Sequence, residues 1–122
     1  MSGNNESAWN ATAGAIFSQQ LGTSDAALYT VPASVRAVQI AQGTLCNTTA
    51  SAVTVYLSVV KAGGAVGDGA HRVISGYSIA ANDTLSLRDY IADHVLGPGD
   101  IISGYASAAS AVDIVVSGTV YA

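Results

Sequence analysis

The segment Val53-Thr-Val-Tyr-Leu-Ser-Val59 alternates apolar and polar side chains without interruption. Successive side chains of a β-strand point to opposite faces, so the four apolar residues of this segment share one face. β-branched and aromatic residues, which fit a pleated sheet well, fill most of its positions. We therefore predict a half-buried β-strand whose apolar face is turned toward a core.

Similar runs continue on both sides of this segment. Other β-rich runs cover residues 28–31, 35–45, 71–75, 77–80, 84–88, 101–107 and 112–121. Turn-forming residues separate them, at Pro32, 47–49, the glycine-rich 62–69, 81–83 and 97–100. Only residues 89–96 have helical spacing, and this stretch is so short that we predict a single turn or an irregular loop. We also expect residues 77–80 and 84–88 to form a hairpin.

Seven or eight short strands at intervals of about ten residues are typical of an all-β domain. No strand is followed by the long amphipathic helix of a parallel α/β fold. A mass of 12.2 kDa is enough for one core and too small for two. We predict an antiparallel β-sandwich or jelly roll of about 7–8 strands over residues 28–122.

Residues 1–27 differ from the rest of the chain, because they hold its single Trp and its single Phe. We predict an N-terminal arm or an edge segment here. Trp9, Ile16 and Phe17 either close the edge of the chain's own core or dock on a neighbouring subunit, since a terminal segment is ordered only when it is tied down.

Charge is scarce: only 10% of the residues are Asp, Glu, Lys or Arg, and none lies between Arg36 and Lys61. Globular domains average about 25%. Large uncharged patches often mark protein contacts. We therefore expect subunit contacts in two places. One is the pair of neighbouring strands formed by the two β runs within 37–60, and the other is the N-terminal segment. The candidate interface residues are Trp9, Ile16, Phe17, Val38, Ile40 and Tyr56.

Several partner classes are disfavoured by the composition. The net charge is −4, and the four cationic residues are scattered, whereas nucleic-acid binding needs clustered cations. No apolar run approaches the roughly 20 residues of a bilayer span. The first six residues are polar and acidic, unlike a secretory signal. We expect a soluble, non-exported protein that binds neither nucleic acid nor membrane.

Catalytic motifs are also lacking. Only His71 and His94 could serve a nucleophile as base, and no serine lies in a G-x-S-x-G elbow. The glycines of 63–69 lead into a strand, whereas phosphate loops lead into a helix. Four aspartates within 83–100 match no EF-hand order, and each fits a turn. We predict no enzyme, catalytic residue, cofactor or metal, although a cation among these aspartates and a glycan-binding face made of tyrosines stay open.

Four segments combine a strand with a turn. They are, in chain order, Tyr29-Thr-Val-Pro-Ala33, Asn47-Thr-Thr followed by Val53-Thr-Val-Tyr-Leu57, Ile79-Ala-Ala-Asn-Asp-Thr-Leu85, and Leu96-Gly-Pro-Gly-Asp-Ile101. In this order they resemble small virion proteins of tailed bacteriophages. The resemblance covers roughly residues 28–120 and lies in the order of strands and turns. It implies a β-sandwich that coats or joins parts of a particle.

The function that follows from this resemblance is a capsid decoration or cement protein. It would bind the major capsid protein or other virion subunits, act as a homo-oligomer with a trimer favoured, and be located in virions assembled in the host cytoplasm. The alternatives are a tail, neck or head-fibre component, or a carbohydrate- or receptor-binding module. A small hydrolase is the remaining alternative.

Overall fold

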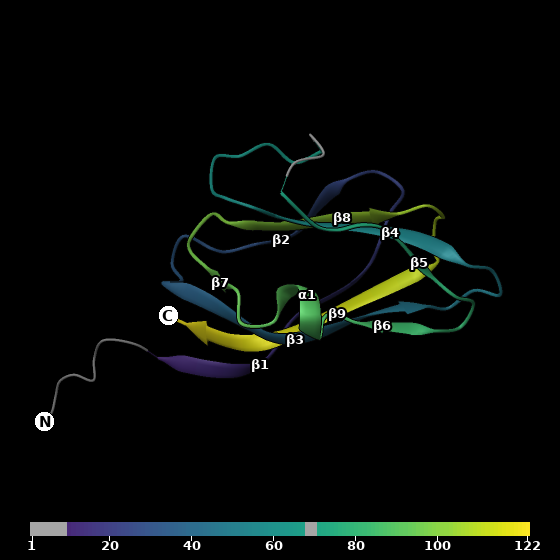
Figure 1. Cartoon of the computed structure of the whole chain (residues 1–122). Coiled ribbons are helices and arrows are strands. Elements are labelled where there is room, and N and C mark those ends of the chain that lie inside the picture. The colour runs from purple at the N-terminus through teal and green to yellow at the C-terminus, as the bar shows by residue number, and fades with distance from the viewer. Residues whose placement is uncertain (1–9, 68–70) are drawn as a thin grey trace, which may run out of the picture.

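The computed structural model describes residues 10–67 and 71–122, which form two antiparallel sheets packed face to face (Figure 1). The five-stranded sheet has the order β1 (Ala11–Gln20), β9 (Val112–Tyr121), β3 (Ala37–Asn47) and β6 (Thr84–Ser86), with β7 (Val95–Leu96) also paired to β3. The four-stranded sheet has the order β2 (Ala26–Thr30), β8 (Ile101–Ala106), β4 (Val53–Val60) and β5 (Arg72–Ile79). The predicted antiparallel β-sandwich is confirmed.

The strand pairs are nested along the chain. β1 pairs with β9, β2 with β8, β3 with β6 and β4 with β5, all antiparallel. The chain is therefore one long hairpin whose tip is the β4–β5 loop, and this hairpin is wrapped so that β9 also pairs with β3 and β8 with β4. With the short β7 set aside, this is the strand order of a jelly roll.

The core lies between the sheets and consists of aliphatic side chains from both. Among the fully buried ones are Leu45 and Ile114 of the five-stranded sheet and Val55 and Leu57 of the four-stranded sheet. Such burial contributes about 1.5–3 kcal/mol per large side chain. Because β3, β4, β8 and β9 each bury apolar side chains in the core, the sheets are held together mainly by this contact.

Each open side of the sandwich is closed differently. On one side, the Phe17 ring of β1 stacks on the Tyr29 ring of β2, with centroids 5.4 Å apart and planes 3° from parallel. Burial raises the pKa of Tyr29 above its ordinary value, because the phenolate would lose hydration. On the other side, the short helix α1 (Arg88–Ile91) inserts Ile91, and Leu87 before it is also buried. This is the single turn predicted for residues 89–96.

β4 confirms the alternation read from the sequence and adds a second buried face. Val53, Val55 and Leu57 point into the core. Ser58 and Val60 are each 1% exposed although they face away from it. The Arg72 side chain lies against Ser58, and the Cγ1 of Val60 approaches Gly64 in the following loop. The outer face of this sheet is therefore partly covered by the chain itself.

Two expected strand pairs do not form. The β runs within 37–60 become β3 and β4, which lie in different sheets, so they are not neighbours. Residues 77–80 and 84–88 do not make a hairpin either, because β5 and β6 also belong to different sheets. In both places the chain turns as expected, but the turn leads from one sheet to the other.

The predicted N-terminal segment is built into the sandwich where the structure describes it. β1 pairs with β9 from Ala11–Tyr121 to Gln20–Asp113, with one bulge between Ala15 and Phe17. Leu21 is 1% exposed. β1 is thus the edge strand of its sheet, whereas Trp9 lies outside the described residues. Among those residues, no helix is long and apolar enough to cross a membrane.

The Asn47 side chain ties the first sheet to the second. Its Nδ2 donates to the carbonyls of Ser51, Ile79 and Ala80 at 2.8, 3.0 and 3.2 Å. Its Oδ1 accepts from the Thr49 backbone and hydroxyl at 3.0 and 2.8 Å. Asn47 ends β3 and Ile79 ends β5, so this fully buried amide spans both sheets.

Replacing Asn47 by Ala should lower the free energy of unfolding by about 2–4 kcal/mol, because buried carbonyls lose their donor. Urea denaturation measures this, with Gln42→Ala on the exposed face of β3 as the control, expected within about 0.5 kcal/mol of the wild type. Equal stability of the two variants would contradict the role given to Asn47.

Gly118 should not tolerate a side chain. It faces the bulge between Ile40 and Gln42 of β3, where a Cβ would overlap the Gln39 carbonyl oxygen and lie 3.0 Å from the Ala41 nitrogen. We expect Gly118→Ala to lose about 3 kcal/mol or more in thermal or urea denaturation. Gly22→Ala is the matched control: a Cβ there meets nothing within 4 Å, and the expected change is below about 1 kcal/mol.

Candidate functional site: an uncharged sheet face

The candidate site is the face of the five-stranded sheet that points away from the core. The strand register shows which residues belong to it. In β9 the side chains at 112, 114 and 116 are buried, so the alternate ones at 113, 115, 117, 119 and 121 point outward. The register carries this alternation to the neighbouring strands. We call the set the outer sheet face: Ala11, Ala13, Ala15, Ser18, Gln20, Ala37, Gln39, Gln42, Thr44, Cys46, Thr84, Ser86, Val95, Asp113, Val115, Ser117, Thr119 and Tyr121.

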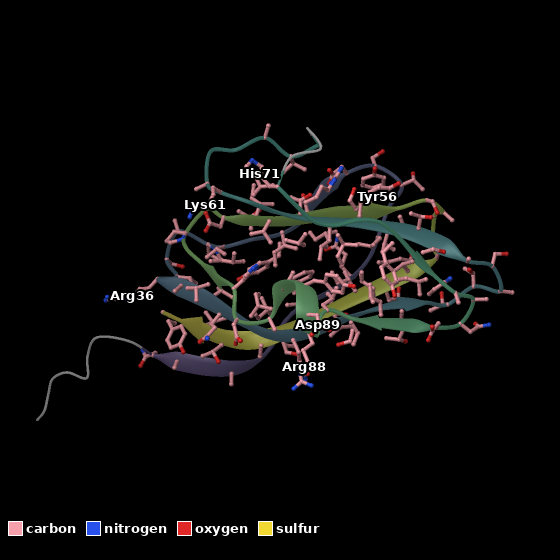
Figure 2. The ribbon with its side chains drawn as sticks, viewed as in Figure 1. Arg36, Tyr56, Lys61, His71, Arg88 and Asp89 are labelled. Atoms are coloured by element: carbon pink, nitrogen blue, oxygen red, sulfur yellow. The ribbon has the colours of Figure 1, made fainter. Side chains whose placement is uncertain are left out.

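Asp113 is the single charged residue of the outer sheet face. It lies in the row at one end, where Gln20 Nε2 donates to its Oδ1 at 3.3 Å. Arg36 precedes β3 at the opposite end, and Figure 2 shows the Arg88 side chain projecting beyond this side of the sheet from the start of α1. Charges are thus confined to the margin of the face.

The side chains of the outer sheet face are mostly small. Alanine, serine and threonine alternate with a few glutamines, and the larger apolar residues exposed on it are Val95 at 63% and Val115 at 39%. Another protein can cover such a surface without desolvating a charge at its centre. This chemistry suits a protein contact.

The five predicted interface residues that the structure describes fall into three groups. Val38 and Ile40 are 0% and 1% exposed and belong to the chain's own core, so we remove them from the candidates. In their place, Ala37 and Gln39 of the same strand face outward. Ile16 and Phe17 are partly buried against the same core. The choice of Val38 and Ile40 was wrong because it rested on the absence of charge and not on the alternation with Ala37 and Gln39, which puts the two larger apolar side chains on the inner face.

Tyr56 remains at the surface, on the outer side of the four-stranded sheet (Figure 2). It is the cross-strand partner of Tyr105, and their rings stack with centroids 4.4 Å apart and planes 7° from parallel. Arg72 Cζ lies 5.6 Å from one centroid and 5.5 Å from the other. These nearly equal distances place the guanidinium beside both rings, where cation–π attraction favours it.

Arg72 crosses the four-stranded sheet to reach an acidic partner. Its Nη1 donates to Ser58 Oγ at 2.8 Å and to Asp25 Oδ2 at 2.9 Å, just before β2. The side chains of this ion pair are only 18% and 11% exposed, so solvent screens them less than an ordinary surface pair. The small serines at 58 and 103, which are cross-strand partners, leave space for the long arginine side chain.

Nothing local in the sequence pairs Asp25 with Arg72, since 47 positions separate them.

The tyrosines do not gather on one face. Tyr29 closes an open side, Tyr77 meets Tyr90 edge to face at 6.4 Å beside α1, and Tyr121 lies on the outer sheet face. The Tyr56–Tyr105 pair is therefore the remaining aromatic candidate on the outer side of the four-stranded sheet.

Two of the four aspartates of residues 83–100 accept hydrogen bonds from backbone nitrogens with their side chains. Asp100 Oδ1 accepts from the Ala62 nitrogen at 2.8 Å and its Oδ2 from the Gly97 nitrogen at 2.9 Å. Asp83 Oδ1 accepts from the Thr84 nitrogen at 2.8 Å. In the described part of the chain, no group of three or more His, Cys, Asp or Glu side chains could hold a metal ion, and no pocket is found.

Comparisons with known proteins give no assignment: no protein-family model matches the chain, and no curated protein matches it significantly in sequence.

The Arg72–Asp25 pair should show measurable coupling. We expect Arg72→Met and Asp25→Asn to be less destabilising together than the sum of the single changes, by about 1–3 kcal/mol, because either change alone leaves a partly buried group without its partner. Urea denaturation of the four proteins in the cycle measures this coupling. Arg88→Met combined with Asp25→Asn is the control cycle, and similar coupling in both cycles would contradict the assignment.

Proposed function

We propose that this protein is a structural component of a bacteriophage virion, and specifically a decoration or cement protein that binds the head surface and stabilises it through protein–protein contacts. The observation that carries the proposal is the outer sheet face, whose single charge, Asp113, lies at one end. It offers a broad and nearly uncharged surface, which suits repeated attachment to copies of one partner.

The dimensions of the outer sheet face suit such a contact. Strands about 4.8 Å apart and a rise of about 3.4 Å per residue give it an area of roughly 600 Å². Stable protein interfaces bury about 800 Å² per partner. The face would supply most of that area, and its margin holds Arg36 and Arg88, whose charges would help to orient the partner.

The architecture and the resemblance described above agree with this proposal. Jelly rolls serve as viral capsid domains and also as lectin domains. Since one fold hosts many functions, this likeness supports the class of protein and not a particular partner. The major capsid protein is the partner we favour, and a tail, neck or head-fibre component is the alternative role within the virion.

A carbohydrate- or receptor-binding role is the second candidate, and the Tyr56–Tyr105 pair favours it. Gly76 lies beside the Tyr56 ring, and a Cβ there would be 3.7 Å from the Tyr56 hydroxyl. The missing side chain leaves that ring less covered, and tyrosine combines an apolar ring with a polar tip. A glycan array with the wild type and Tyr56→Ala tests this role. Binding that disappears in the variant would support it, and a blank array would count against it.

The decoration role predicts a high copy number. Quantitative mass spectrometry of purified particles should find the protein near the abundance of the major capsid protein. A few copies per particle would instead assign it to the tail or neck, and its absence from particles would overturn the proposal.

A matched pair of variants links that role to the outer sheet face. Val115→Lys places a positive charge on β9, the strand between β1 and β3 in this face, whereas Ser78→Lys places the same charge on an exposed strand of the other sheet. Both changes should alter stability by less than about 1 kcal/mol. We expect only Val115→Lys to abolish binding to heads that lack the protein, and equal binding of both variants would exclude this face.

A further inference from the structure

We propose that β1 is a self-association edge, along which a second copy of this chain adds its own β1 antiparallel and extends the five-stranded sheet across a two-fold axis. An edge strand presents unpaired N–H and C=O groups, which can template pairing with another chain. This contact uses the rim of the sheet, so it leaves the outer sheet face open and does not depend on the proposed function.

β1 is the terminal strand of its sheet and pairs only with β9 among the described residues. It is ten residues long, and eight of them are exposed. Its sequence, Ala11-Thr-Ala-Gly-Ala-Ile-Phe-Ser-Gln-Gln20, contains no charged residue and no proline. Charged residues and prolines usually keep an edge strand from pairing with another chain, and β1 has neither. The bulge between Ala15 and Phe17 is its one protective feature.

The other edges of the described sheets are better protected. β6 and β7 have three and two residues. β2 has five residues with a bulge, and Pro32 follows it shortly. β5 begins at the charged Arg72, has two irregularities in its register and contains Gly76 at a φ of +75°. β1 is therefore the long edge that lacks such protection.

The hydrogen-bond pattern shows which groups of β1 face outward. Asn10 and Ala122 exchange both backbone bonds, at 3.1 and 2.9 Å. In an antiparallel ladder, hydrogen-bonded residue pairs alternate with pairs that are not hydrogen-bonded to each other. Counting from Asn10, the alanines at 11, 13 and 15 are in the second kind of pair, so their N–H and C=O groups point away from β9, toward the free edge. This regular stretch ends at the bulge, so its centre is Ala13.

A two-fold axis at Ala13 sets the register of the proposed pair. Ala13 lies opposite Ala13 of the second copy, and Ala11 lies opposite Ala15 of that copy. Identical strands often oppose like charges when they pair, which is unfavourable, but β1 has no charge to oppose. Alanine also adds no bulk at the junction.

Antiparallel pairing of identical edges closes at two copies. The trimer expected from the sequence would need a head-to-tail contact between two different surfaces, and no second edge of comparable length and exposure lies among the described residues. The edge thus favours a dimer.

Sedimentation velocity of the wild type tests the proposal directly. We expect a dimer of about 24 kDa, twice the 12.2 kDa of one chain. Ala13→Pro removes the outward N–H but no ladder bond to β9, and proline is tolerated at such edge positions. It should give a monomer with an unchanged circular dichroism spectrum. Ala13→Val keeps the N–H and is the matched control, expected to remain a dimer.

Two further measurements keep the test decisive if Ala13→Pro fails to fold. The variants Ala11→Lys/Ala15→Lys and Ala11→Glu/Ala15→Glu should each be monomeric and should form a heterodimer when mixed. In the wild type, hydrogen exchange at the Ala13 amide should slow by about tenfold or more as concentration rises. A wild type that is monomeric at the highest concentration, a trimer, or a dimer unaffected by Ala13→Pro would overturn the proposal.

Discussion

The buried amide of Asn47 is the contact on which the arrangement of the two sheets depends most. The chain leaves the five-stranded sheet at this residue, and the carbonyls that its Nδ2 meets belong to the crossover and to the end of β5 in the other sheet. Hydrophobic burial holds the sheets together but has no direction. The hydrogen bonds of Asn47 supply direction, because they are satisfied only when the end of β3 and the end of β5 lie side by side.

The two outer surfaces of the sandwich differ in chemistry. On the four-stranded sheet, Arg72 is used internally: it neutralises Asp25, contacts Ser58 and lies beside a pair of stacked tyrosines. On the five-stranded sheet, the outer sheet face is left almost without charge. The scarcity of charge in the composition is thus most evident on one face. The proposed partner contact and the proposed β1 contact lie next to each other on that sheet.

The candidate site could be predicted only in part. The low charge indicated a contact surface, and β3 does contribute to it. The particular residues were chosen wrongly, because a lack of charge does not say which side of a strand faces the core. The alternation of Val38 and Ile40 with Ala37 and Gln39 does say so, and both larger apolar side chains are buried. In β4, where valine and leucine alternate with polar residues, the inward side was evident from the sequence.

The sequence by itself determined that the chain is an antiparallel sandwich, where most strands and turns lie, and that residues 89–96 hold no long helix. These features follow from side-chain periodicity and turn chemistry, which act over a few residues. Only the tertiary structure decided which strands are neighbours: β3 and β4, and likewise β5 and β6, are joined by turns but lie in different sheets. The reason is physical. A turn sets where the chain bends, whereas the sheet that a strand joins is selected by distant groups, such as Asp25 meeting Arg72 and Asn47 meeting the end of β5.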